Sequence, residues 1–289
     1  MKDEVTLQEA VRRSTEYLAG HGLKTPRQDA QLLVLKATGK DLAFLLTHPE
    51  WKLAGEHRQK LEQWLEKRKE HCPLQYLLGS QEFFGRTFQV DSSVLIPRPE
   101  TELVVETCLE LLATLDKDPI RVVDIGTGSG CIAVTLACDD PRVQVTAVDI
   151  SEAALGVARE NARRLGCINQ VDFLQGDVLG PLESSGKVFD LIASNPPYVE
   201  DQSAEVEYSV KTFEPREAVF AGPTGLEIYT KIFKSSRQLL KHPGWLVLEM
   251  GYGISERVAA LAGIEGWRRV EIRNDLAGIP RCAVFNHGT

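Results

Sequence analysis

The sequence predicts an α/β fold, in which a mostly parallel sheet of seven strands with an antiparallel last strand follows a small helical bundle. Apolar residues recur at helical spacing in the first quarter of the chain. Further on, short runs rich in β-branched residues alternate with helical segments, a pattern typical of a parallel sheet. A glycine-rich turn joins the first such run, 120–125, directly to a helix.

The helical bundle is expected over residues 1–73. Its first helix ends at Gly20-His21-Gly22, Thr25-Pro26 starts the second, and a long charged helix closes the segment near Cys72-Pro73. The basic run Lys67-Arg68-Lys69 is flanked by glutamates, which favours a solvated helix face over a nucleic-acid patch. A bundle without chemistry of its own is expected to hold a partner or to orient the active domain.

Residues 74–99 are expected to form a β-hairpin linker, and residues 100–289 the sheet domain. The run 81–90 is rich in aromatic residues and broken by Gly85, which favours a hairpin. Arg98 and Glu100 lie on a segment stiffened by prolines, where they either face a ligand or cap a helix. The sequence alone leaves both readings open.

The glycine-rich turn predicts a ligand cradle at the end of the first strand. It consists of Gly126-Thr127-Gly128-Ser129-Gly130, and a helix begins at Cys131. A ligand can approach such a turn closely because its glycines project no side chain. The dinucleotide fingerprint requires glycine where Cys131 stands, and the lysine of a nucleotide triphosphate loop is missing. The turn therefore favours a different nucleotide-like ligand.

Three further strand ends carry polar groups. Asp149 ends the run 143–148, about 20 residues after the glycines, a separation at which an acid reaches a ribose hydroxyl pair. Asp177 and Val178 follow the third strand and together suit an adenine, one by polar contact and the other by packing. Ligands of open α/β sheets bind at the carboxyl ends of the strands, so these groups are expected to line one crevice.

The fourth strand end delivers the tetrapeptide Asn195-Pro196-Pro197-Tyr198. A planar nitrogen is a poor nucleophile because its lone pair is delocalised. The Asn195 side-chain oxygen and the Pro196 carbonyl can accept both of its N–H bonds, while two prolines offer no competing backbone donor. Tyr198 supplies a flat face for a planar group. The structural alternative is a proline-rich turn after a strand.

Composition excludes several classes of function. A net charge of -8 and a pI near 5.4 argue against a protein that mainly grips phosphate backbones, so no direct nucleic-acid partner is expected. The N-terminus lacks an apolar signal segment, and no window is long and apolar enough to span a bilayer, which predicts a cytoplasmic protein. The six cysteines show no Cys-x-x-Cys spacing and the histidines no zinc-helix pairing, so no metal is expected.

The glycine turn, Asp149, Asp177 and the tetrapeptide together resemble a class I, Rossmann-like methyltransferase that uses S-adenosylmethionine. A longer pattern resembles the HemK/PrmC family, the peptide chain release factor N5-glutamine methyltransferases. It covers nearly the whole chain, and its motifs are Gln81-Glu82-Phe83-Phe84-Gly85, Ile96-Pro97-Arg98-Pro99-Glu100-Thr101-Glu102, residues 124–130 and Glu214-Pro215-Arg216-Glu217-Ala218. Where the family commonly shows Gly-Gly-x-Asp-Gly-Leu, this chain has Thr224 in place of the acid, so no acidic contact is expected there.

The resemblance implies methyl transfer to the glutamine of the Gly-Gly-Gln motif in class 1 release factors, with S-adenosylhomocysteine as the product. It assigns catalysis to the tetrapeptide and a substrate-binding role to the helical domain. Cofactor binding falls to Gly126, Thr127, Gly128, Ser129, Gly130, Asp149, Asp177, Val178, Asn195 and Arg98. Two alternatives stay open: an adenine-N6-type nucleic-acid methyltransferase, because that amine has the same planar geometry, and a non-enzymatic adenosyl-ligand sensor.

Overall fold

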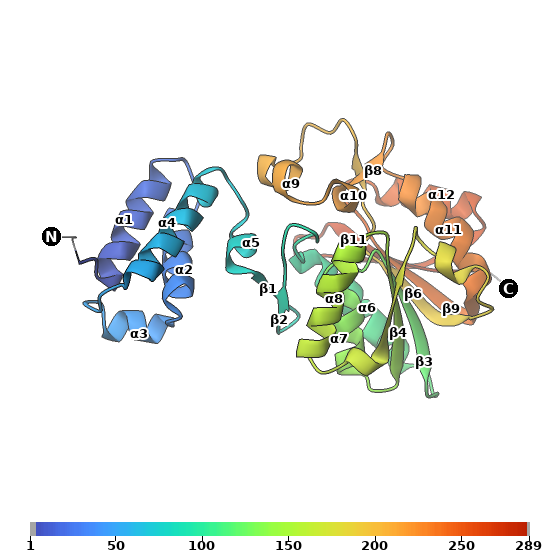
Figure 1. The fold of residues 1–289 in the computed structure, drawn as a ribbon. Coiled ribbons are helices and arrows are strands. Elements are labelled where there is room, and N and C mark those ends of the chain that lie inside the picture. The colour runs from blue at the N-terminus through green and yellow to red at the C-terminus, as the bar shows by residue number, and fades with distance from the viewer. Residues whose placement is uncertain (1–3, 288–289) are drawn as a thin grey trace. The chain divides into compact units, whose positions relative to one another are not determined.

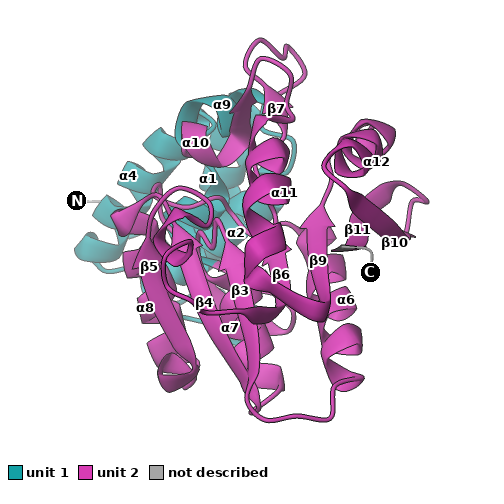
Figure 2. Ribbon diagram, turned by 90° about the vertical axis from the view of Figure 1, so that its right-hand side faces the viewer, with its two compact units in different colours: residues 1–80, 207–213 teal, residues 81–206, 214–289 magenta. Residues whose placement is uncertain are grey.

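The computed structural model describes residues 4–287, which divide into two compact units (Figures 1 and 2). Unit 1 comprises residues 1–80 and 207–213, and unit 2 comprises residues 81–206 and 214–289. The segment expected to be a linker, 74–99, is thus divided between the two units. Within residues 4–287, no helix combines the length and the apolar character that crossing a membrane requires.

Unit 1 is helical. Its helices are α1 (Leu7–Ala19), α2 (Pro26–Thr38), α3 (Leu42–Thr47), α4 (Gly55–Lys69), α5 (Leu74–Leu78) and α9 (Tyr208–Phe213). Thr6 caps α1 by accepting a hydrogen bond from the Glu9 amide, and Pro26 opens α2 where no amide donor is needed. The core gathers apolar residues of α1, α2 and α4, and Phe213 of α9 packs against it.

Unit 2 is built on a seven-stranded sheet with the order β10-β11-β9-β6-β3-β4-β5. Its strands are β3 (Ile120–Ile125), β4 (Val143–Asp149), β5 (Val171–Gln175), β6 (Phe189–Ser194), β9 (Leu240–Glu249), β10 (Trp267–Asn274) and β11 (Pro280–His287). Only β11 runs antiparallel to its neighbours, β9 and β10, and the pairs from β9 to β5 are all parallel. The expected seven strands and the antiparallel last strand are confirmed.

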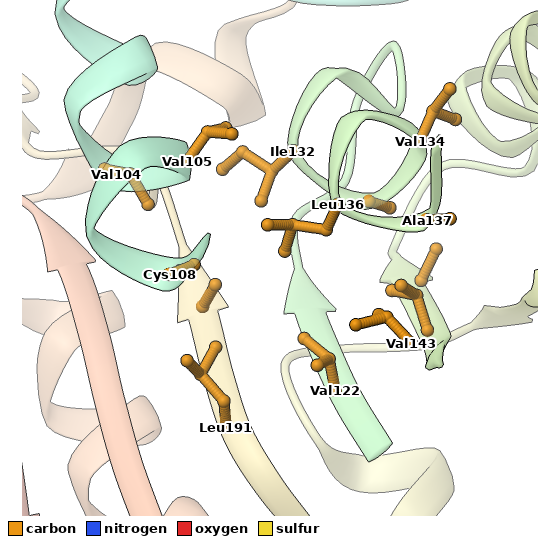
Figure 3. Close-up of a cluster of buried hydrophobic side chains, with 14 of the residues drawn as sticks. Val104, Val105, Cys108, Val122, Ile132, Val134, Leu136, Ala137, Val143 and Leu191 are labelled. Atoms are coloured by element: carbon orange, nitrogen blue, oxygen red, sulfur yellow. The ribbon is translucent and has the colours of Figure 1, made fainter. Parts of the chain in front are cut away.

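Helices cover both faces of this sheet. They are α6 (Glu102–Ala113), α7 (Cys131–Asp139), α8 (Glu152–Arg164), α11 (Glu227–Leu239) and α12 (Ser255–Ile264). The short helix α10 (Arg216–Val219) and the 3-10 turns η1 (Pro99–Thr101), η2 (Ile168–Gln170) and η3 (Gly180–Leu182) lie in the connections. Successive strand residues point to opposite faces. In β3, Val122 belongs to the buried cluster that includes α6 and α7, whereas Val123 belongs to the one that includes α11 and α12. Figure 3 shows the first of these layers, with Val105 and Leu136 above Val122.

Two small sheets complete the fold. β1 (Ser80–Phe83) pairs with β2 (Arg86–Gln89), which confirms the expected hairpin, and β7 (Val199–Glu200) pairs with β8 (Phe220–Gly222). β9 contains Pro243 and Gly244 near its start. Its register against β6 is irregular between Phe189 and Leu191, and such an irregularity accommodates a proline and a glycine within a strand.

Candidate active site

A cavity of about 270 Å³ lies at the carboxyl ends of the central strands of unit 2. The ends of β3, β4, β5 and β6 all contribute to its lining, as the sequence predicts for an open α/β sheet. The predicted site residues that line it are Gly126, Gly128, Asp149, Asp177, Val178, Asn195, Pro196 and Pro197. Four separate strand ends therefore meet at one site.

The glycine turn forms one wall of this cavity. Gly128 lies at φ +55, a conformation that favours glycine, and its amide donates a 2.8 Å hydrogen bond to Asp149 Oδ2. Gly130 lies at φ +81, and a Cβ added there would sit 3.1 Å from Cβ of Ala158. Glycine at this position therefore lets α7 begin against α8.

Asp149 is fixed from both of its carboxylate oxygens. Oδ2 accepts from Gly128, and Oδ1 accepts from the Ser151 amide at 2.9 Å. Burial raises the pKa of Asp149, although these two backbone donors act in the opposite direction. Asp177, by contrast, forms a 2.5 Å ion pair with Lys231, and both side chains are about half exposed (54% and 51%). Lys231 also lines the cavity but was not predicted from the sequence.

The Asn195 side chain is held by a hydrogen-bond chain. Its Nδ2 donates to Thr101 Oγ1 at 3.0 Å, and the Thr101 hydroxyl donates to Glu249 Oε2 at 2.6 Å. Thr101 and Glu249 are both 1% exposed, whereas Asn195 is half-buried at the cavity. Burial is the main cause that raises the pKa of Glu249, to about 7.

Tyr198 packs tightly on the backbone that follows β9. A Cβ added to Gly251 would lie 2.5 Å from Cδ2 of the Tyr198 ring. Burial and the nearby Glu249 carboxyl raise the pKa of the phenol to about 12. Tyr198 is not among the described residues that line the cavity. Its ring is therefore not part of the cavity wall, unlike the other three residues of the tetrapeptide.

Arg98 is engaged by a buried carboxylate. Its guanidinium lies 2.6 Å from Glu214 Oε1, and the other oxygen of Glu214 accepts from the Ile96 amide at 3.1 Å. The Glu214 side chain is only 2% exposed. The pair joins two of the family-like motifs, and Pro215 next to it lines the cavity. Among the described residues, the cavity lining does not include Arg98.

Hydrogen bonds to buried side chains hold Thr127 and Ser129 of the turn in place. The Thr127 hydroxyl donates to Asp124 Oδ2 at 2.6 Å, and Asn161 of α8 donates to the Ser129 carbonyl at 2.8 Å. Asn161 also donates to the carbonyl of Gln89 in β2, so one side chain ties the hairpin to the turn.

Asp124 was not assigned a role from the sequence. It is fully buried, and burial raises its pKa to about 7. Its Oδ1 has no hydrogen-bond partner among residues 4–287. An acidic residue inside an apolar strand is the signal that identifies it, because such a group is costly unless it has a use. Glu249, at the end of an equally apolar strand, carries the same signal.

These features fit an adenosyl cofactor. The turn exposes backbone to the cavity at Gly126 and Gly128, a fixed carboxylate stands at Asp149, and Asp124 keeps a buried oxygen unpaired beneath the turn. Across the part of the chain that the structure describes, no group of three or more His, Cys, Asp or Glu side chains is arranged to hold a metal ion.

The fold occurs in solved methyltransferases. The hMettl16 catalytic domain in complex with MAT2A 3'UTR hairpin 1 matches with a TM-score of 0.57 and 14% identity, covering 95% of this chain and 91% of that one. The Thermus thermophilus 16S rRNA N2 G1207 methyltransferase, in complex with AdoMet and guanosine, matches with a TM-score of 0.52 and 16% identity, covering 73% and 50%. At these identities, the matches show a shared fold.

Closer relatives are found by sequence. Residues 9–79 match the PrmC N-terminal domain, and residues 106–242 match the methyltransferase small domain. The release factor glutamine methyltransferase of Koribacter versatilis is 41% identical, with 97% of this chain and 98% of that protein covered. Those of Bacillus subtilis and Vibrio cholerae are 37% and 35% identical over at least 97% of each chain. The chain therefore belongs to the release factor glutamine methyltransferase family.

Proposed function

We propose that this protein transfers a methyl group from S-adenosylmethionine to the side-chain amide nitrogen of the glutamine in the Gly-Gly-Gln motif of class 1 release factors. One observation carries the proposal beyond family membership. The cavity is lined on one side by Gly126, Gly128 and Asp149 and on another by Asn195 and Pro196. A nucleotide-like cradle and a pair of hydrogen-bond acceptors thus share one site.

The cofactor half of the cavity is formed by the turn and two acids. S-adenosylmethionine, when bound, supplies an electrophilic methyl group on a sulfonium centre. The turn 126–130 gives the cofactor a close backbone approach, and Asp149 accepts from the ribose hydroxyls. Asp177 and Val178 hold the adenine edge. Arg98 serves this site indirectly, because its guanidinium neutralises Glu214 beside the cavity-lining Pro215.

The acceptor half binds an uncharged planar nitrogen. Asn195 Oδ1 and the Pro196 carbonyl accept its two N–H bonds, and neither Pro196 nor Pro197 carries a backbone donor that would compete for the lone pair. Tyr198 does not line the cavity, so the flat face expected from the sequence is not offered to the substrate; its ring packs against Gly251 and holds the backbone of the residues before it. Most of the rate enhancement comes from alignment of the nitrogen with the methyl group.

Unit 1 is proposed to bind the release factor. The match of residues 9–79 to the PrmC N-terminal domain supports this role. None of the unit 1 residues that the structure describes lines the cavity, so this unit is free to bind a partner. The release factor must present a loop glutamine to unit 2, so a second binding surface supplies affinity without crowding the reacting group.

The experiment is a methyl-transfer assay with labelled cofactor that offers a release factor, DNA and RNA in parallel. Label is expected only on the release factor, with one methyl on its glutamine by mass spectrometry. Asn195→Ala should lower kcat on the order of 100-fold, since it removes one of two acceptors, while cofactor affinity changes by less than about threefold. Label on nucleic acid, or a cofactor complex that never turns over, would support one of the two alternatives instead.

A further inference from the structure

We propose that Thr101 and Glu249 act as positioning residues that fix the amide orientation of Asn195, so that its oxygen and not its nitrogen is offered to the substrate. This inference rests on the proposed function, in which Asn195 Oδ1 accepts a hydrogen bond from the substrate amide. An asparagine amide has a donor and an acceptor end of nearly equal shape, so a half-turn about its last torsion exchanges them. An unrestrained Asn195 would therefore present the wrong group in part of the molecules.

While Glu249 is ionised, the hydrogen-bond chain has a single direction. A carboxylate can only accept, so the Thr101 hydroxyl proton must point toward Glu249 Oε2, 2.6 Å away. The Thr101 oxygen is then left with lone pairs only. The group of Asn195 that faces it at 3.0 Å must be the donor, Nδ2. Oδ1 of the same amide remains available as an acceptor at the cavity that Asn195 lines.

The fold gives this chain of contacts a rigid frame. Glu249 ends β9 and Asn195 follows β6, and the two strands pair in register as far as Ser194 and Leu248. Thr101 lies at the start of α6, which packs on the sheet. The backbone carbonyl of Glu249 also accepts from the buried Tyr229 hydroxyl at 2.7 Å. Each member is thus held from a different element.

Protonation of Glu249 on Oε2, the oxygen that faces Thr101, would reverse the chain of bonds, because that oxygen would then donate. A neutral carboxyl can donate to Thr101, whose hydroxyl would then donate to Asn195, and Asn195 would have to turn its oxygen away from the substrate. The charged groups that act on Glu249 are Glu100, Arg98 and Arg281. Glu249 in turn raises the pKa of the neighbouring titratable groups Cys131, Tyr198, Tyr229 and Cys282. Glu100 raises the pKa of Glu249 and the two arginines lower it, while burial has the largest effect.

The test compares substitutions that keep shape and remove the hydroxyl or the charge. Thr101→Val should lower kcat on the order of 100-fold with little change in KM for the release factor, and Thr101→Ser should restore kcat to within about threefold. The matched control is Thr107→Val, because Thr107 is equally buried but its hydroxyl donates to the Leu103 carbonyl and accepts from the Cys282 thiol, without contact to Glu249 or Asn195. Its kcat should stay within about threefold of the parent value.

A pH profile separates positioning from packing. At saturating cofactor, kcat of the parent protein should fall as the pH is lowered through about 7. Glu249→Gln should be slower at high pH and should lack this fall, because its amide does not titrate. A kcat of Thr101→Val within threefold of the parent, a failure of Thr101→Ser to rescue, or a loss of activity in Thr107→Val as large as that in Thr101→Val would overturn the proposal.

A readout without substrate distinguishes this proposal from the proposed function. The side-chain amide resonance of Asn195, assigned by its loss in Asn195→Ala, should titrate with the Glu249 carboxyl in the parent protein. It should not do so in Thr101→Val or in Glu249→Gln. If the parent protein methylated no release factor but showed this titration, the proposed function would fail, whereas the hydrogen-bond chain from Glu249 to Asn195 would be supported. If the Asn195 resonance titrated equally in Thr101→Val, the proposed hydrogen-bond chain would be refuted, whether or not the protein methylates a release factor.

Discussion

Gly251→Ala tests whether the position of Tyr198 matters for methyl transfer. Gly251 is buried, and the added Cβ would lie 2.5 Å from Cδ2 and 2.8 Å from Cε2 of the tyrosine ring. Ordinary van der Waals contact begins at 3.4 Å, so the ring must retreat by roughly 0.9 Å. The backbone of Tyr198 has little room, because a Cβ on Gly225 would already stand 2.6 Å from its carbonyl oxygen.

A displacement of about 1 Å in a group that positions a substrate costs on the order of 100-fold in rate, and this is the expected loss in kcat/KM. Cofactor affinity, measured by calorimetry, should be unchanged because the turn 126–130 is not touched. Tyr198→Leu in the Gly251→Ala background should relieve the overlap and recover stability without recovering activity. If Gly251→Ala kept kcat/KM within about threefold and unfolded at the same denaturant concentration as the parent protein, the positioning role of Tyr198 would be refuted.

Three further substitutions probe the frame of the site. Gly156→Ala, at an exposed position inside α8 where a Cβ meets nothing within 4 Å, should stabilise the fold by about 1 kcal/mol in denaturant unfolding and leave kcat unchanged; a loss of stability would contradict this. Arg98→Met should cost about 3 kcal/mol, since it strands the buried carboxylate of Glu214, and an unchanged unfolding midpoint would show that the pair is not needed. Burial raises the pKa of Asp124 to about 7, so the folded state binds its proton more tightly than the unfolded chain does. The stabilisation from this group is therefore lost as the pH rises from about 4 to about 7. Asp124→Asn should flatten that part of the stability profile relative to the parent protein, and identical profiles would refute it.

The sequence was informative wherever the chain makes local structure. The run 120–125 is β-branched, and the glycines after it can only be a tight turn, so the cradle and its strand were identified together. The acid at Asp149 followed from spacing along the chain. The convergence at the cavity followed in turn from a general property of parallel sheets.

What could not be predicted depends on contacts between distant residues. The Thr101 to Glu249 bond joins residues 148 apart, and the Arg98 to Glu214 pair joins residues 116 apart. No local pattern distinguishes a threonine that caps a helix from one that meets a carboxylate across the sheet. Likewise, nothing near Arg98 in the sequence indicates Glu214 as its partner. The family resemblance placed Arg98 at the cofactor, whereas the structure pairs it with Glu214.

The division of the chain bears on how recognition and chemistry are coupled. An adenine amine has the same planar geometry as an amide, so the acceptors at Asn195 and Pro196 alone cannot choose between a nucleic acid and a glutamine. Selection must therefore come from elsewhere, and the acidic balance of the chain disfavours a phosphate backbone. Residues 207–213 belong to unit 1, yet in sequence they lie between Tyr198 and the cavity-lining Pro215. A partner bound to unit 1 at residues 207–213 would therefore contact a segment that continues along the chain, through Glu214, into the cavity-lining Pro215.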